Sequence, residues 1–223
     1  MDLSKSYEYF QPEKDNSRIH ILGCGSVGST LAENLARMGL TKFTLWDFDI
    51  VEPKNIVNQM FTTEDIGRPK VEALKDILLR INPEIENDIE LKPDGWKGKM
   101  LSGYLFLCVD NIDLRRTIVE KHMNTPYVKA VFDFRTGLED AQHYAADWSD
   151  LKMKTDLYNS MKFSHEEAKE ETPASACNVT LGVCPTVRII CAYGVSNFIN
   201  FLRGKGLKKT ILADAFNFDV MAF

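Results

Sequence analysis

The sequence lacks several features that would each identify a class of protein. Its five cysteines include no C-x-x-C pair, which excludes a tetrathiolate zinc site, and their odd, unpatterned number fits a reducing compartment. The net charge of −5 argues against nonspecific nucleic-acid binding. No apolar run approaches the ~20 residues that cross a membrane, and the segment after Met1 lacks a signal peptide's apolar core. We therefore expect a cytoplasmic protein without zinc, nucleic-acid partner or membrane segment.

What is present begins with a glycine-rich turn. An apolar run over 18–22 leads into Gly23-Cys24-Gly25-Ser26-Val27-Gly28, and apolar residues then recur at helical spacing. This pattern predicts a strand, a tight turn and a helix. Gly23 permits the turn, Gly25 lets the backbone approach a pyrophosphate, and Gly28 lets helix and strand pack closely. The free amides around Ser26 and the helix dipole favour an anion.

The next elements supply groups that suit a nucleotide. A second strand, predicted over 43–46, ends in Asp47, where a carboxylate accepts hydrogen bonds from ribose hydroxyls. The aperiodic stretch 48–66 indicates a functional loop. A helix is predicted from Pro69 to Ile81, so Lys70 lies at its start, where the dipole disfavours a cation and a phosphate partner is indicated; a solvated lysine is the alternative. The polar residues of the loop that face a ligand in this interpretation are Asp49, Asn55, Asn58 and Gln59.

These elements follow one another in a recognisable order. The series GxGxxG, D-x-D-x-V, N-x-x-x-Q-x-F and D-I-G-x-P-K-x-x-A is followed by Cys108-Val109-Asp110-Asn111 and Arg115. From about residue 18 to residue 115 it resembles the adenylating domain of ubiquitin-activating-type enzymes, the ThiF/MoeB/HesA superfamily, and 186–202 resembles the family's late helix more loosely. The resemblance implies a Rossmann-like fold that binds ATP with Mg²⁺ and adenylates a carboxylate, commonly the C-terminus of a ubiquitin-like protein or a peptide. Relatives are commonly dimers, so a homodimer is expected.

The resemblance also implies roles for individual residues. Lys70 and a magnesium ion held by Asp110 would neutralise the departing pyrophosphate, and Asp47 would fix the ribose. Arg115 would contact a phosphate or order Asp110, which otherwise reads as a helix N-cap. Cys177, in an apparent loop near the expected crossover segment, is a candidate nucleophile beside the catalytic pair Lys70 and Asp110. The full ATP-binding set is Gly23, Gly25, Ser26, Gly28, Asp47, Asp49, Asn55, Asn58, Gln59, Lys70, Asp110, Asn111 and Arg115.

One position departs from the family pattern and leaves alternatives open. The family usually has N-x-x-R-Q in the polar loop, and this chain has Asn58 in place of the arginine, so a charged phosphate contact is missing. Lys54 or a second subunit would have to replace it, or the protein binds a nucleotide or a partner without turnover. An NAD-dependent oxidoreductase would use the same turn and Asp47, but we find no catalytic Tyr/Lys or His pair.

The remaining chain completes an α/β fold: a Rossmann-like doubly wound, mostly parallel sheet with helices on both faces and a C-terminal antiparallel extension. We predict a single domain over 1–223, with its nucleotide-binding part at about 18–132 and a crossover and substrate-binding part at about 133–223. His20 is predicted to be a packed core residue, and Asp133-Phe134-Arg135 to follow a strand. Further strands are predicted over 85–91, 104–109, 127–132, 142–146, 210–213 and 216–221, and helices over 112–122 and 186–202. In the charged stretch 148–172, the run 166–171 is predicted to be a solvated helix or a mobile crossover segment.

Overall fold

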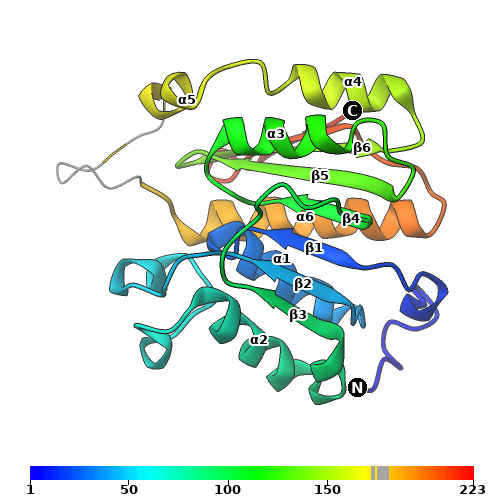
Figure 1. Cartoon of the computed structure of the whole chain (residues 1–223), viewed down its shortest axis with the longest axis vertical. Coiled ribbons are helices and arrows are strands. Elements are labelled where there is room, and N and C mark those ends of the chain that lie inside the picture. Colours follow the sequence, from blue (N-terminus) through cyan, green and yellow to red (C-terminus); the bar gives the residue numbers. More distant parts are fainter. Residues whose placement is uncertain (172–173, 175–180) are drawn as a thin grey trace.

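The computed structural model describes residues 1–171, 174 and 181–223. Its centre is an eight-stranded sheet in the order β3-β2-β1-β4-β5-β6-β7-β8 (Figure 1). The first five strands are parallel, and β6, β7 and β8 extend the sheet in antiparallel fashion. The predicted fold class is therefore confirmed. Among the described residues, no helix combines the length and the apolar character needed to cross a membrane.

The strands are β1 (Ile19–Leu22), β2 (Phe43–Trp46), β3 (Ile89–Lys92), β4 (Gly103–Leu107), β5 (Val128–Thr136), β6 (Asp140–Asp147), β7 (Thr210–Asp214) and β8 (Asp219–Ala222). The helices are α1 (Ser26–Arg37), α2 (Lys70–Ile81), α3 (Ile112–His122), α4 (Leu151–Asn159), α5 (His165–Glu171) and α6 (Cys184–Leu202). Short 3-10 helices occupy Pro12–Lys14, Pro53–Val57, Thr63–Asp65 and Pro83–Asp88.

The central strands β1, β2 and β4 are buried on both faces, as the apolar run of β4 predicts for a parallel strand. On one face Phe106 and Phe132 meet Phe198 of α6 edge to face, in a core that α1 and α2 also cover. On the other face Leu105 packs with Ile118 of α3, in a second core that includes α4. Helices therefore lie on both faces, as expected for a doubly wound sheet.

Two predicted elements differ in extent from those observed. β5 does not end before Asp133 but continues to Thr136, because β6 pairs with it as far as Thr136 and Ala141. The first half of the predicted strand 85–91 is a 3-10 helix, since Pro83 opens a helical turn and the side chain of Asn82 accepts the amide of Glu84. In the charged stretch 148–172, α4 is a packed helix that buries Met153, and the run 166–171 falls in α5, where Glu166 and Glu167 are exposed.

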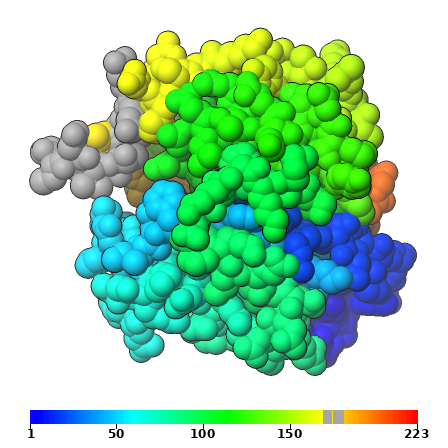
Figure 2. All heavy atoms as spheres, in the orientation of Figure 1, coloured from blue at the N-terminus to red at the C-terminus, as the bar shows by residue number. Residues whose placement is uncertain are grey.

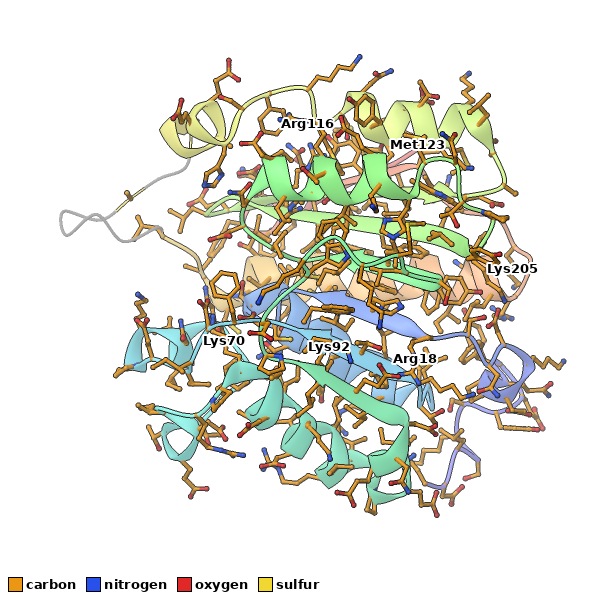
Figure 3. All side chains as sticks on the ribbon, viewed as in Figure 1. Arg18, Lys70, Lys92, Arg116, Met123 and Lys205 are labelled. Atoms are coloured by element: carbon orange, nitrogen blue, oxygen red, sulfur yellow. The ribbon has the colours of Figure 1, made fainter. Side chains whose placement is uncertain are left out.

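The fold brings the carboxyl ends of β1, β2 and β4 to one edge of the sheet. This edge lies on the left in Figure 1, where α1 and α2 also begin. Figure 3 places Lys70 at this edge and Arg18 and Lys205 at the opposite one. Ligands of doubly wound sheets bind at the carboxyl ends of the strands.

Candidate active site

The glycine turn has the geometry that its sequence predicts. Gly23 adopts a φ of 96°, and a Cβ there would lie 2.8 Å from backbone atoms of Cys108 and Val109. A Cβ on Gly28 would lie 1.9 Å from the carbonyl oxygen of Gly23, so this glycine is required for helix and strand to pack. Among the described residues, a Cβ on Gly25 would have only Gln59 Nε2, 4.0 Å away, as a neighbour within that distance. No other described atom therefore fills the space over Gly25.

The start of α1 suits an anion. Gly25 is its N-cap and makes no side-chain cap, and no acidic residue lies in the first helical turn that begins at Ser26. In the part of the chain that the structure describes, the amides of that turn thus have no side-chain acceptor. Uncapped amides together with the positive end of the helix dipole form a site for phosphate.

Asp47 is fixed beside this turn. Its Oδ2 accepts the amide of Cys24 at 2.6 Å, and its Oδ1 accepts the amide of Asp49 at 2.8 Å. Burial raises the pKa of Asp47, while the two amides and the charge of Lys70 act in the opposite direction. A carboxylate held in this way keeps lone pairs for ribose hydroxyls, and the ribose contact itself remains a prediction.

The polar loop presents one side chain without a partner. Gln59 Oε1 is buried and forms no hydrogen bond within the described part of the chain, although its amide faces the open space over Gly25. A buried acceptor of this kind is costly unless a ligand or water satisfies it. Asn55 is also buried, and its Oδ1 accepts the amide of Glu52 at 2.8 Å, which shapes the loop. Contact between Asn55 and ATP remains a prediction.

Asn58, which stands at the position of the family's arginine, and Lys54, which was proposed to replace its charge, both have partners within the protein. Asn58 Nδ2 donates to the carbonyl of Gly182 at 3.3 Å and so joins the loop to the segment before α6. Lys54 Nζ pairs with Glu52 at 2.7 Å on the surface, and this hydrogen bond raises the pKa of Lys54. Lys54 is thus a paired, exposed cation.

Lys70 is buried, and the structure gives it a carboxylate partner. Its Nζ lies 2.7 Å from Asp49 Oδ2, and its amide donates to the Asp49 carbonyl at 2.9 Å. The alternative of a solvated lysine is therefore wrong. A phosphate partner would share the ammonium with Asp49 and remains a prediction.

Asp110 lies past the end of β4 and is exposed. Its side chain takes part in no hydrogen bond or ion pair among the described residues, which leaves both carboxylate oxygens available. It is not the N-cap of α3: Asn111 caps that helix, with its Oδ1 accepting the amide of Leu114 at 2.9 Å. In Figure 2 the loop after β2, in light blue and cyan, lies at the left of the molecule beside green atoms of the chain between β3 and α3.

Arg115 turns its donors inward. Its guanidinium contacts the carbonyl of Val109, the residue before Asp110, and lies 2.5 Å from Asp133 Oδ1 and 2.5 Å from the carbonyl of Phe134. It therefore orders the chain that carries Asp110 through the backbone. The predicted phosphate contact of Arg115 stays a prediction.

A buried ion cluster continues from Arg115. Asp133 is fully buried, and its Oδ2 accepts Arg135 Nε at 2.7 Å. Arg135 also donates to the carbonyl and the hydroxyl of Ser160, each at 2.9 Å, and stacks over Tyr144. The cluster thus joins the end of β4 to the connection between α4 and α5.

The cysteines of the described residues mostly behave as small hydrophobic residues. Burial raises the pKa of the Cys24, Cys108 and Cys191 thiols, which keeps them protonated and unreactive. Cys184 is half-buried at the start of α6. Cys177, the predicted nucleophile, lies outside the described residues. His20 is confirmed as a core residue, since it is 5% exposed and bonded to Ser102 and Trp46.

Sequence reasoning missed two residues near the site. Asp133 was expected beyond a strand, and only the pairing of β5 with β6 shows that it is buried between two arginines. Arg188 is a cation within an apolar helix, a signal that the sequence does contain, and it reaches Thr30 of α1. Among the described residues no three His, Cys, Asp or Glu side chains are grouped to hold a metal ion, so Asp110 is a single carboxylate ligand candidate.

Comparison with known proteins identifies related sequences. The model of the ThiF family matches residues 3–223. Ubiquitin-like modifier-activating enzyme 5 of Caenorhabditis briggsae is 29% identical over 133 residues, which are 53% of this chain and 30% of that enzyme. Molybdopterin-synthase adenylyltransferase of Salmonella typhimurium is 32% identical over 108 residues, 46% of this chain and 43% of that enzyme. The chain thus spans less than half the length of these relatives.

Solved structures share the fold. Escherichia coli MccB with ATP superposes with a TM-score of 0.69 at 19% identity, over 93% of this chain and 63% of that one. MccB with AMPCPP and MccA gives a TM-score of 0.71 at 19% identity, with the same coverage. At this identity the likeness concerns the arrangement of the strands and helices.

Proposed function

We propose that this chain, which belongs to the ThiF family, activates a carboxylate by transferring to it the adenylyl group of ATP. The observation that carries the proposal is the buried, unpartnered Oε1 of Gln59 beside the open Gly25 and the uncapped start of α1. These groups surround a space with donors and an acceptor that lack protein partners. A nucleoside triphosphate would satisfy both kinds of group, because its phosphate oxygens accept from the α1 amides and its ribose hydroxyls or adenine amino group can donate to Gln59 Oε1.

The chemistry requires little from the protein beyond position and charge. A carboxylate is already a nucleophile, so its attack on the α-phosphate needs no general base. Pyrophosphate leaves with added negative charge, which the α1 amides and Lys70 would stabilise. Asp47 would hold the ribose, and this would fix the α-phosphate in line with the incoming carboxylate.

Asp110 fits the magnesium ion that accompanies ATP. Carboxylate oxygen is a ligand that Mg²⁺ prefers, and one or two carboxylates with phosphate oxygens are its usual partners in nucleotide sites. Asp110 is exposed and has no hydrogen bond or ion pair among the described residues, and the end of its strand touches the glycine turn through Gly23. The ion supplies positive charge to the phosphates when it is bound.

The substrate class is proposed from the relatives. Their names describe an enzyme that activates a ubiquitin-like modifier, an adenylyltransferase of molybdopterin synthase, and MccB bound to MccA. We extend this to a C-terminal carboxylate of a ubiquitin-like protein or peptide. A single domain over 1–223 that acts as a homodimer is part of the same proposal.

ATP–pyrophosphate exchange tests the function. Candidate ubiquitin-like proteins and peptides would be supplied with ATP, Mg²⁺ and labelled pyrophosphate, and label should enter ATP only with a competent carboxylate. The matched control is the same peptide with a C-terminal amide, which cannot attack the phosphate. Exchange that persists with the amide would contradict carboxylate adenylation.

The second candidate function is binding of a nucleotide or a partner without turnover. Asn58 stands where the family carries arginine, and its side chain is hydrogen-bonded to the carbonyl of Gly182. The variant Asn58→Arg separates the two functions. If the parent protein binds MgATP but exchanges no pyrophosphate, and Asn58→Arg gains exchange, the native protein is a binder. If the parent protein exchanges pyrophosphate, the adenylation proposal holds.

A further inference from the structure

Arg188 is a half-buried cation whose described partners are all neutral. On α6, its Nε donates to Cys184 Sγ at 3.4 Å, and its Nη1 donates to Thr30 Oγ1 at 3.0 Å and contacts Met60 Sδ. No carboxylate pairs with it in residues 1–171, 174 and 181–223. Arginines with limited solvent access normally pair with a carboxylate or a phosphate, because desolvation of the charge is costly.

The position of Arg188 joins three elements of the nucleotide site. Thr30, which accepts its bond, donates in turn to the carbonyl of Ser26, the first residue of α1, at 2.8 Å. Met60 follows Gln59 in the polar loop, and its amide donates to Ser29 Oγ of α1 at 3.2 Å. Arg188 thus lies where the first turn of α1, the polar loop and α6 meet.

The site itself is short of positive charge. The side chains around the glycine turn include Asp47, Asp49 and Asp110, against Lys70, whose ammonium is already paired with Asp49. Lys54 is paired with Glu52, and position 58 carries no charge. A triphosphate adds several negative charges to this set, so a cation without an anionic partner at its edge has a clear electrostatic use.

We propose that Arg188 supplies positive charge to the β- and γ-phosphates of ATP from α6, in place of the arginine that position 58 lacks. The inference rests on the proposed function, because it needs a nucleotide over the glycine turn. Arg188 Nη2 has no partner among the described residues and is available to a phosphate oxygen. Because Nε and Nη1 already donate to Cys184 and Thr30, Nη2 is the nitrogen that would donate to the phosphate, while the whole guanidinium contributes its charge.

Calorimetric titration of MgATP and of AMP into the full chain tests this assignment. Arg188→Met keeps much of the aliphatic packing and removes the charge, and it should lower the affinity for MgATP about 10- to 100-fold. The affinity for AMP, which lacks the outer phosphates, should change less than about twofold. Arg188→Lys keeps the charge and should retain most of the affinity.

Two further variants give the control and the rescue. Arg203→Met removes the same charge from the other end of α6, about 22 Å away along the helix axis, where Arg203 stacks on Tyr9, and it should leave MgATP affinity unchanged. Asn58→Arg in the Arg188→Met background should restore it. A thermal melt of each variant reports folding.

The outcomes separate the two proposals. If the parent protein binds no MgATP, the proposed function fails and this inference fails with it. If the parent protein binds MgATP and Arg188→Met binds it equally well, or loses AMP and MgATP to the same degree, only the role of Arg188 is overturned. The same follows if Arg203→Met reproduces the loss.

Discussion

Gly25 and Gly28 lie three residues apart in one turn, but the structure gives them different requirements. At Gly28 a side chain would meet the Gly23 carbonyl at 1.9 Å, a backbone contact that cannot move without opening the turn. At Gly25 it would meet only Gln59 Nε2 at 4.0 Å. The first glycine leaves room for a ligand, and the second allows the helix to pack on the strand.

Substitution by alanine should separate these roles. Gly28→Ala should destabilise the fold by about 2 kcal/mol or more, since overpacking against backbone costs roughly 1–3 kcal/mol. Gly25→Ala should cost less than about 1 kcal/mol of stability and remove MgATP binding, because its methyl group occupies the phosphate position. Urea unfolding and calorimetric titration measure the two effects. Equal loss of stability in both variants would contradict the assignment.

Lys70 offers a second test at the residue scale. If its charge stabilises the departing pyrophosphate, Lys70→Ala should raise the barrier to adenylate formation by about 2–4 kcal/mol at saturating ATP. Lys75→Ala is the matched control, because Lys75 lies on the same helix and pairs with Glu86. Pyrophosphate exchange rates measure both. Full turnover of Lys70→Ala at saturating ATP would place Lys70 in ground-state binding instead.

At the scale of elements, the buried cluster of Arg115, Asp133 and Arg135 joins α3, β5 and the connection after α4. Removing one member of a buried ion pair leaves an uncompensated charge and costs about 3–5 kcal/mol. We expect this cost for Asp133→Ala, measured by urea unfolding. Arg116→Met is the control. Arg116 also holds this connection, since it donates to the carbonyls of Met161 and Phe163, but it lies nearer the surface. Its substitution should lower the free energy of unfolding by about 1 kcal/mol. Similar costs for both would show that burial of the cluster contributes little.

The sequence predicted these elements unevenly, for physical reasons. The glycine turn, β2 and the helix over 112–122 follow from local patterns, and each was predicted within about one residue. The length of β5 depends on its pairing with β6. The burial of Asp133 depends on Arg115, 18 residues before it, and on Arg135, two residues after it. The partner of Lys70 was missed because Asp49 lies 21 residues away. Contacts between distant segments leave no periodic signal.

At the scale of the whole molecule, three histidines are buried in the same chemical arrangement. In each ring one nitrogen donates to a backbone carbonyl, and the other accepts a hydrogen bond from an N–H group. The acceptor nitrogens are His20 Nδ1 from Trp46 Nε1, His122 Nε2 from the amide of Leu101, and His143 Nε2 from Asn197 Nδ2. Protonation of the acceptor nitrogen would place its new hydrogen against the hydrogen of the N–H group that donates to it. The native state therefore holds all three rings neutral.

The free energy of unfolding should therefore fall in mild acid. Burial lowers the pKa of His20 and His143 to about 4 and lowers that of His122, while the unfolded chain titrates near 6.5. Between these values the unfolded state binds more protons, so stability rises with pH and is complete above about pH 7. His20 and His143 should each contribute a slope of about 1.4 kcal/mol per pH unit between about pH 6 and 5, and His122 adds a slope of the same sign. Urea unfolding at a series of pH values measures the slope, and His143→Gln should reduce it by one histidine's share. A slope that His143→Gln leaves unchanged would show that the His143 ring is already protonated in the folded protein.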